Sequence, residues 1–151
     1  MLNIRVVIKG DKKVISQLKN INNAFKDWKP ELTAVGDFLK DFYADPVFET
    51  EGGIFAARWQ KLSTAYSVRK AEQYPGRGIL EASGTMRRSY ETKVFSNLLQ
   101  LINPVEYAVY HQEGRGVPER LLIKVDDKIK SQVIDVFKKG ALIKLQKAIK
   151  G

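Results

Sequence analysis

Apolar residues recur at helical spacing in two early segments of the chain. Within residues 12–28 and again within 31–43, they lie three or four positions apart, which predicts two amphipathic helices. Pro30 lies between the two runs, where it ends the first helix and suits the first turn of the second. Residues 2–9 alternate loosely and are rich in β-branched side chains, so they predict a strand.

The middle of the chain predicts loops, a helix and a hairpin. A Gly-Gly pair marks residues 51–58 as a loop or exposed finger. Ser63 is a suitable N-cap for a helix that runs to about residue 73. Gly84 predicts a turn. Residues 88–103 hold two strand-like runs around a Ser-Asn pair, which is typical of a β-hairpin.

The last part of the chain predicts a short strand and a long helix. LLIKV at 121–125 is strand-like, and Asp126-Asp127 then place acids at a helix start, where they interact favourably with its dipole. Strands and helices are segregated along the chain rather than alternating. We therefore expect an α+β fold with a small, mostly antiparallel sheet, packed helices, a long C-terminal helix and an extended loop.

The composition indicates one soluble domain over residues 1–151, with mobile loops at about 44–58 and 71–79. The 44% hydrophobic content is enough for a core, and no apolar run approaches the ~20 residues that span a bilayer. The chain has no cysteine and one histidine, which excludes thiolate chemistry and His-rich metal sites. We expect no cofactor, no metal and no membrane partner.

The charge is strongly basic and unevenly spread. The net charge is +9, and residues 58–88 hold seven basic residues against two acids, with aromatic residues between them. Such a segment is typical of a module that binds nucleic acid by charge and stacking. It is equally typical of a contact surface for an acidic protein, since arginine and aromatic residues are enriched at interfaces. Composition leaves both hypotheses open.

The stretch YAVYHQEGRGVPER at 107–120 resembles an active site, since it gathers His111 with an acid and two arginines on a glycine-rich loop. A catalytic histidine needs a nucleophile and an orienting acid within hydrogen-bond reach. No G-x-S-x-G motif is present, and Ala82-Ser83-Gly84 comes nearest. We therefore expect no enzymatic activity, and we expect His111 to form a hydrogen bond near a helix end.

Four elements in order are more informative than any single motif. They are RWQKLSTAYSVRK (58–70), ILEASGTMRRSY (79–90), EYAVYHQEGRG (106–116) and PERLLIKV (118–125). Together they resemble the phage virion morphogenesis and tail completion family over about residues 55–125. The matching positions are Trp59, Leu62, Ser63, Lys70, Leu80, Ser83, Gly84, Met86, Ser89, Tyr107, Ala108, His111, Gly114, Pro118 and Arg120.

The resemblance implies a structural protein of the virion neck or head-proximal tail end. It would be assembled in the host bacterial cytoplasm, act as a ring of copies and contact other neck and tail proteins. Nonspecific contact with nucleic acid is compatible with the charge. The expected interface residues are Trp59, Arg69, Lys70, Arg87, Arg88, Glu113, Arg115 and Arg120. The residues expected to shape the local backbone are Gly84, His111, Gly114 and Pro118.

Overall fold

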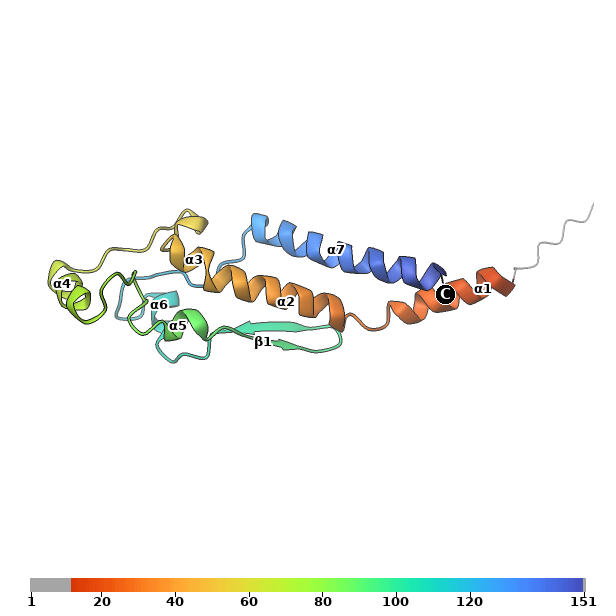
Figure 1. Ribbon diagram of the computed structural model, residues 1–151, viewed down its shortest axis with the longest axis horizontal. Helices are drawn as coiled ribbons and strands as arrows, with labels where there is room; N and C mark the ends of the chain where they lie inside the picture. Colours follow the sequence, from red (N-terminus) through yellow and green to blue (C-terminus); the bar gives the residue numbers. More distant parts are fainter. Residues whose placement is uncertain (1–11, 151) are drawn as a thin grey trace, which may run out of the picture.

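A long helix forms the middle layer of an elongated molecule (Figure 1). The computed structural model describes residues 12–150. Helix α2 (Lys29–Ala44) lies between α7 (Asp127–Lys150) on one side and the antiparallel strands β1 (Glu91–Val94) and β2 (Leu99–Ile102) on the other. Helix α1 (Lys12–Ala24) extends from one end of this layer and packs on α7. The predicted α+β fold is confirmed, whereas the strand predicted over residues 2–9 lies outside the described residues.

Short elements make up the other end of the molecule, where α2 leads into the core. The core contains aromatic side chains that stack around Tyr43, Phe55 and Tyr90. Among the described residues, no helix has the length and apolar character needed to cross a bilayer. The short elements are α3 (Pro46–Glu49), η1 (Gly53–Phe55), α4 (Thr64–Gln73), α5 (Thr85–Arg88) and α6 (Ala108–Glu113).

Local capping and turn signals in the sequence are confirmed. The hydroxyl of Ser63 accepts a hydrogen bond from the Tyr66 amide at the start of α4. Asp126 accepts one from the Ile129 amide at 2.9 Å, which fixes the start of α7. Gly84 takes a positive φ of 73°, as a turn residue can without a steric penalty. These signals are short-range, so the rest of the fold cannot easily override them.

The segment expected as an exposed finger is instead part of the core. Val47, Phe48 and Phe55 are buried, and α3 and η1 give this corner regular hydrogen bonds. Gly52 lies so close to Trp59 that a Cβ there would come within 2.6 Å of the indole ring. The loop predicted at 51–58 is confirmed, whereas the exposed finger is wrong because Phe55 turns into the core. The mobility of residues 44–58 stays a prediction.

The strand predicted at 121–125 is also wrong, because side chains take the place of a neighbouring strand. Gln112 accepts hydrogen bonds from the Leu122 and Ile123 amides at 2.8 and 2.9 Å, and its amide group donates to the Ile123 carbonyl at 2.9 Å. The segment is extended and apolar, as the sequence indicates, but its backbone pairs with side chains. Three more of its carbonyls accept from Trp59 Nε1, Tyr90 Oη and Tyr43 Oη.

The predicted first helix is confirmed over Lys12–Ala24, but its apolar face is not buried. None of its residues is buried, and Val14, Ile15 and Leu18 are exposed. Beyond the end of the helix, Trp28 stacks on Phe137 of α7 with ring centroids 4.7 Å apart, and both residues are partly buried. Helix α1 therefore presents an apolar face that no described part of the chain covers.

Candidate functional site

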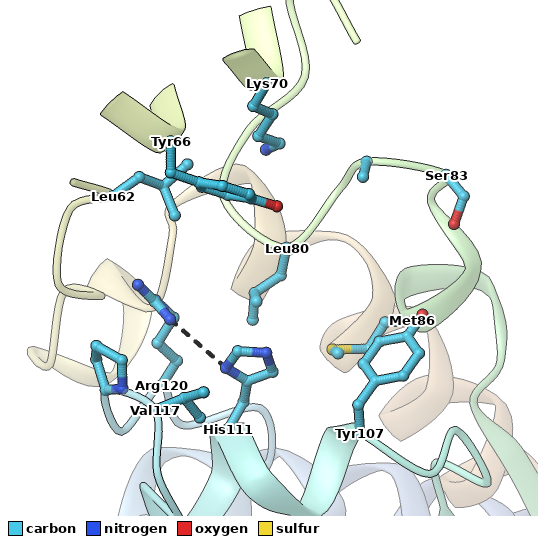
Figure 2. Close-up of a pocket in the computed structure, with 12 residues that line it drawn as sticks. Leu62, Tyr66, Lys70, Leu80, Ser83, Met86, Tyr107, His111, Val117 and Arg120 are labelled. Atoms are coloured by element: carbon cyan, nitrogen blue, oxygen red, sulfur yellow. Dashed lines mark hydrogen bonds between the residues drawn. The ribbon is translucent and has the colours of Figure 1, made fainter. Parts of the chain in front are cut away.

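The candidate site is a pocket of about 490 Å³ between α4, the turn before α5, and α6 with the loop that follows it (Figure 2). We call it the His111 pocket. Its walls are mainly apolar, with a few polar groups from three separate segments. The lining residues are Leu62, Tyr66, Lys70, Leu80, Ala82, Ser83, Met86, Tyr107, His111, Val117, Pro118 and Arg120.

Arg120 borders the pocket, where it is buried rather than placed on the outer surface, and its expected contact with a partner stays a prediction. It is only 4% exposed. Its Nε and Nη2 atoms donate to the Gln60 carbonyl at 3.2 and 3.0 Å, and Nη1 lies 3.5 Å from His111 Nδ1 (Figure 2). Burial lowers the pKa of the guanidinium. Within residues 12–150, no carboxylate forms an ion pair with Arg120.

His111 lies in the last turn of α6, and its backbone makes the expected hydrogen bond near a helix end. The carbonyl accepts from the Arg120 amide at 2.7 Å, and Gly114, with a φ of 67°, ends the helix as predicted. The imidazole ring, however, lines the open pocket and is not enclosed by the core. Burial lowers the pKa of His111, and the Arg120 charge lowers it further. The imidazole is therefore neutral at pH 7.

Ser83 lines the same pocket, which is the arrangement that would favour hydrolytic chemistry. Its hydroxyl, however, lies 2.8 Å from Thr85 Oγ1 and also accepts from the Thr85 amide. Among the described residues, no hydrogen bond joins Ser83 to His111, and the lining includes no carboxylate. Nucleophilic catalysis needs a hydrogen bond from nucleophile to base and an acid that orients the base. The geometry adds no support for that chemistry.

The lowered pKa of His111 predicts a specific pH dependence of stability. The unfolded chain keeps the ordinary histidine pKa of about 6.5, so below that pH it binds the proton more readily than the folded chain does. The free energy of unfolding should therefore fall as the pH falls from 7.5 through 6.5, and His111→Asn should remove this part of the fall. Urea unfolding of both proteins at pH 7.5 and 5.5 measures it. Equal pH dependence in the two proteins would contradict the assignment.

Lys70 is buried and holds the turn that follows α4. Its ammonium donates to the carbonyls of Arg77, at 3.3 Å, and Gly78. Burial lowers the pKa of Lys70, while the charges of Glu81 and Glu51 act in the opposite direction. Lys70 therefore has a structural role in this turn, and its expected contact with a partner stays a prediction. The exposed turn at residues 74–77 is fixed at its base, while the mobility expected for 71–79 stays a prediction.

Arg87 and Arg88 already interact with other groups of the chain. Arg87 forms ion pairs with Asp45 at 2.7 Å, Glu81 at 2.8 Å and Glu49 at 3.3 Å. Hydrogen bonds to Glu81 and then Asp45 raise its pKa. Arg88 donates to the Ser83 carbonyl at 2.8 Å. The basic segment therefore offers fewer free cations than its composition indicates.

The other expected interface residues divide between the core and the surface. Trp59 is buried edge-on against Phe48, so it packs in the core, and its expected role at an interface stays a prediction. Arg69 is exposed, with its guanidinium 5.4 Å from the centre of the Tyr66 ring. Glu113 and Arg115 are exposed and form an ion pair with each other. These last three residues remain candidates for partner contact.

Sequence reasoning missed several residues that shape the site. Gln60 supplies the carbonyl that holds Arg120, and Gln112 fixes the segment behind it. Tyr66 faces the pocket beside Lys70, which the sequence analysis names, and their spacing of four along α4 is a signal that could have placed both on one side of the helix. No short-range signal identifies the two glutamines, because their roles depend on contacts with distant parts of the chain.

The comparisons with known proteins leave the site to be interpreted from its own chemistry. No family model, no curated protein and no solved structure matches the chain. Among the described residues, no group of three or more histidine or carboxylate side chains is placed to hold a metal ion.

Proposed function

We propose that the chain is a structural subunit of a tailed phage or prophage virion, which acts in tail completion or head–tail joining and catalyses no reaction. The resemblance of its motifs to the virion morphogenesis family suggests this role. The observation that carries it is an extensive apolar surface at one end of the molecule. Exposed apolar patches of this kind mark interaction sites in soluble proteins.

This apolar end is made by three parts of the chain in the same half of the molecule, with the hairpin turn on the opposite side of α2 from α7 (Figure 1). Helix α1 meets the last turns of α7, where Gln17 donates to the Ile149 carbonyl at 3.0 Å. The hairpin turn reaches the same end, since its Ser96 carbonyl accepts from the Trp28 amide at 3.3 Å. Large apolar side chains are exposed on all three parts: Val14, Ile15, Leu18, Phe95, Leu98, Leu142, Ile143 and Ile149.

The exposed apolar face of helix α1 is what we expect of a subunit in which neighbouring subunits bury that face. A helix of 13 residues is marginal in water by itself, so its stability must come from packing. In the described chain it packs on α7 and buries none of its residues fully. An adjacent copy or an axial partner that covers Val14, Ile15 and Leu18 would supply the missing burial.

The alternative, a nucleic-acid-binding module, receives less support. Single-strand binding uses a groove of free cations with aromatic side chains for stacking. In residues 58–88, Lys70 is buried, Arg87 is neutralised by three carboxylates and Arg88 turns toward a backbone carbonyl. Nonspecific attraction of polyanions by the net charge of +9 remains expected.

Changing the face of α1 should separate assembly from folding. The double variant Ile15→Gln/Leu18→Gln keeps good helix formers at two exposed positions, so its stability should change by less than about 0.5 kcal/mol. Its binding to tails that lack the protein should fall by at least about tenfold, since apolar contacts would be replaced by polar ones. Co-sedimentation with purified tails measures the binding.

A matched control distinguishes this face from any exposed apolar position. Val68→Gln on α4 also replaces an exposed apolar residue, far from the apolar end. We expect it to bind tails like the unchanged protein. If the α1 double variant binds tails as tightly as the control, the α1 face is not the assembly surface.

A further inference from the structure

We propose that the His111 pocket is a binding site for a peptide segment of a protein partner, which inserts an aspartate or glutamate flanked by apolar side chains. The Arg120 guanidinium would receive the carboxylate, and the apolar walls would receive the flanking residues. The inference follows from the chemistry of the pocket and stands whether or not the chain has the role proposed above.

The cationic group of the pocket is the buried Arg120, which pairs with no carboxylate among the described residues. Arg120 is 4% exposed, and within residues 12–150 its guanidinium contacts the Gln60 carbonyl and, at a longer distance of 3.5 Å, His111. A buried charge without a counter-charge is costly, so such groups are usually paired. A guanidinium has five N–H donors, and a carboxylate can accept two of them side by side. An incoming carboxylate would complete the pairing.

The histidine ring supports the same assignment. Its Nδ1 atom faces Arg120, and Nε2 has no hydrogen-bond partner within the described residues (Figure 2). The two groups lie at the floor of one hollow, on the same side as Val117 (Figure 2). An acid placed between them would accept from Arg120 and also favour the protonated imidazole. The binding of a carboxylate should therefore be detectable at His111 itself.

The rest of the pocket is suited to apolar side chains. Leu62, Leu80, Met86 and Val117 line it, and Tyr66 and Tyr107 stand at its sides (Figure 2). A volume of about 490 Å³ lies in the range of ligand pockets and is far too small for a folded domain. An extended peptide with one acid between two apolar residues matches this pocket, because the acid can reach Arg120 and the apolar residues can contact the apolar walls.

A nucleic-acid phosphate is a poorer match for the same cation. Phosphate backbones are held by several exposed lysines and arginines along a groove. In this pocket, Lys70 already donates to two backbone carbonyls, which leaves Arg120 as the main cation toward the hollow. Apolar walls also gain nothing from a sugar-phosphate chain. The structure therefore favours a peptide, and an oligonucleotide serves as the competing ligand in the test.

The test uses NMR, because the only histidine in the chain gives a single set of imidazole signals. The ligand is the blocked peptide acetyl-Ala-Leu-Glu-Leu-Ala-amide, and its matched control carries glutamine in place of glutamate. We expect the glutamate peptide to shift the imidazole signals and raise the pKa of His111, and to bind at least about tenfold more tightly than the glutamine peptide. Equal affinities, or no binding of either peptide at millimolar concentration, would overturn the proposal.

A variant at the rim tests the location without touching the buried arginine. Val117→Asp places a competing carboxylate at the pocket, and Val109→Asp makes the same change at an exposed position outside it. We expect the first to weaken peptide binding at least about tenfold and the second to leave it unchanged. Equal binding by the two variants would contradict the site. A single-stranded oligonucleotide that displaces the peptide and shifts His111 equally would assign the pocket to nucleic acid instead.

Discussion

Replacing Trp59 with alanine should lower the free energy of unfolding by about 3–5 kcal/mol. The indole is 3% exposed, packs edge-on against Phe48 at a centroid distance of 5.3 Å and donates to the Leu121 carbonyl at 3.0 Å. Removing it leaves a cavity in the core and an unpaired carbonyl in a segment that relies on side-chain partners. Chemical denaturation of the purified variant measures the loss.

Two control variants separate the contributions to this effect. Trp59→Phe keeps most of the ring packing and loses the donor, so it should cost about 1–3 kcal/mol, as expected for an unsatisfied buried carbonyl. Phe95→Ala removes an aromatic ring that is half exposed at the hairpin turn and should cost much less. If Trp59→Ala is as stable as the unchanged protein but fails to assemble, Trp59 is an interface residue after all.

Replacing Lys144 with methionine should destabilise the protein by about 3 kcal/mol, because it breaks a buried ion pair. Lys144 Nζ lies 2.7 Å from Glu31, whose side chain is only 4% exposed, and 5.0 Å from the centre of the Trp28 ring. Its ammonium also donates to the Asp27 carbonyl. Lys144 therefore joins α7 to α2 and to the linker before it, and its loss leaves the Glu31 carboxylate buried without a partner.

A second pair on the same helix provides the matched control. Lys130 forms an ion pair with Asp127 at 3.2 Å, but both side chains are largely exposed. Lys130→Met should therefore change stability by less than about 1 kcal/mol. The double variant Glu31→Met/Lys144→Met should recover much of the loss caused by Lys144→Met, since it removes both charges. A single variant as stable as the Lys130 control would contradict the account of this contact.

The parts of the fold that could be predicted are those determined by neighbouring residues. The cap at Ser63, the turn at Gly84, the acid at Asp126 and the hairpin all depend on a few consecutive positions, and all are confirmed. The end of α6 at Gly114 belongs with them. Features of this kind can be predicted from the sequence because each depends only on residues within one turn of the chain.

The parts that were missed depend on contacts between distant residues. Segment 121–125 is not a strand because Gln112 and residues as far away as Tyr43 bond its backbone. Lys70 and Arg120 were expected at the surface because basic residues are seldom buried, yet backbone carbonyls from residues 60, 77 and 78 hold them inside. The candidate pocket therefore could not be assembled from the sequence, although most of its lining residues, including His111 and Pro118, are matching positions of the four sequence elements.

The apolar end of the molecule links the fold to the proposed role. Its exposed residues come from α1, the hairpin turn and the end of α7, which three separate contacts bring together. The His111 pocket is built from the short elements of the other end. A subunit with an apolar surface at one end and a peptide-sized pocket toward the other could contact two different neighbours, as a component between head and tail must.

The central claim is most directly tested by joining heads and tails in the absence of the protein. Tails are prepared from a phage or prophage in which this gene is deleted, mixed with purified heads and examined by electron microscopy. We predict that these tails fail to join heads, that adding the purified chain restores joining, and that the added protein lies at the head-proximal end of the tail. Tails that join heads fully without the protein would contradict the account.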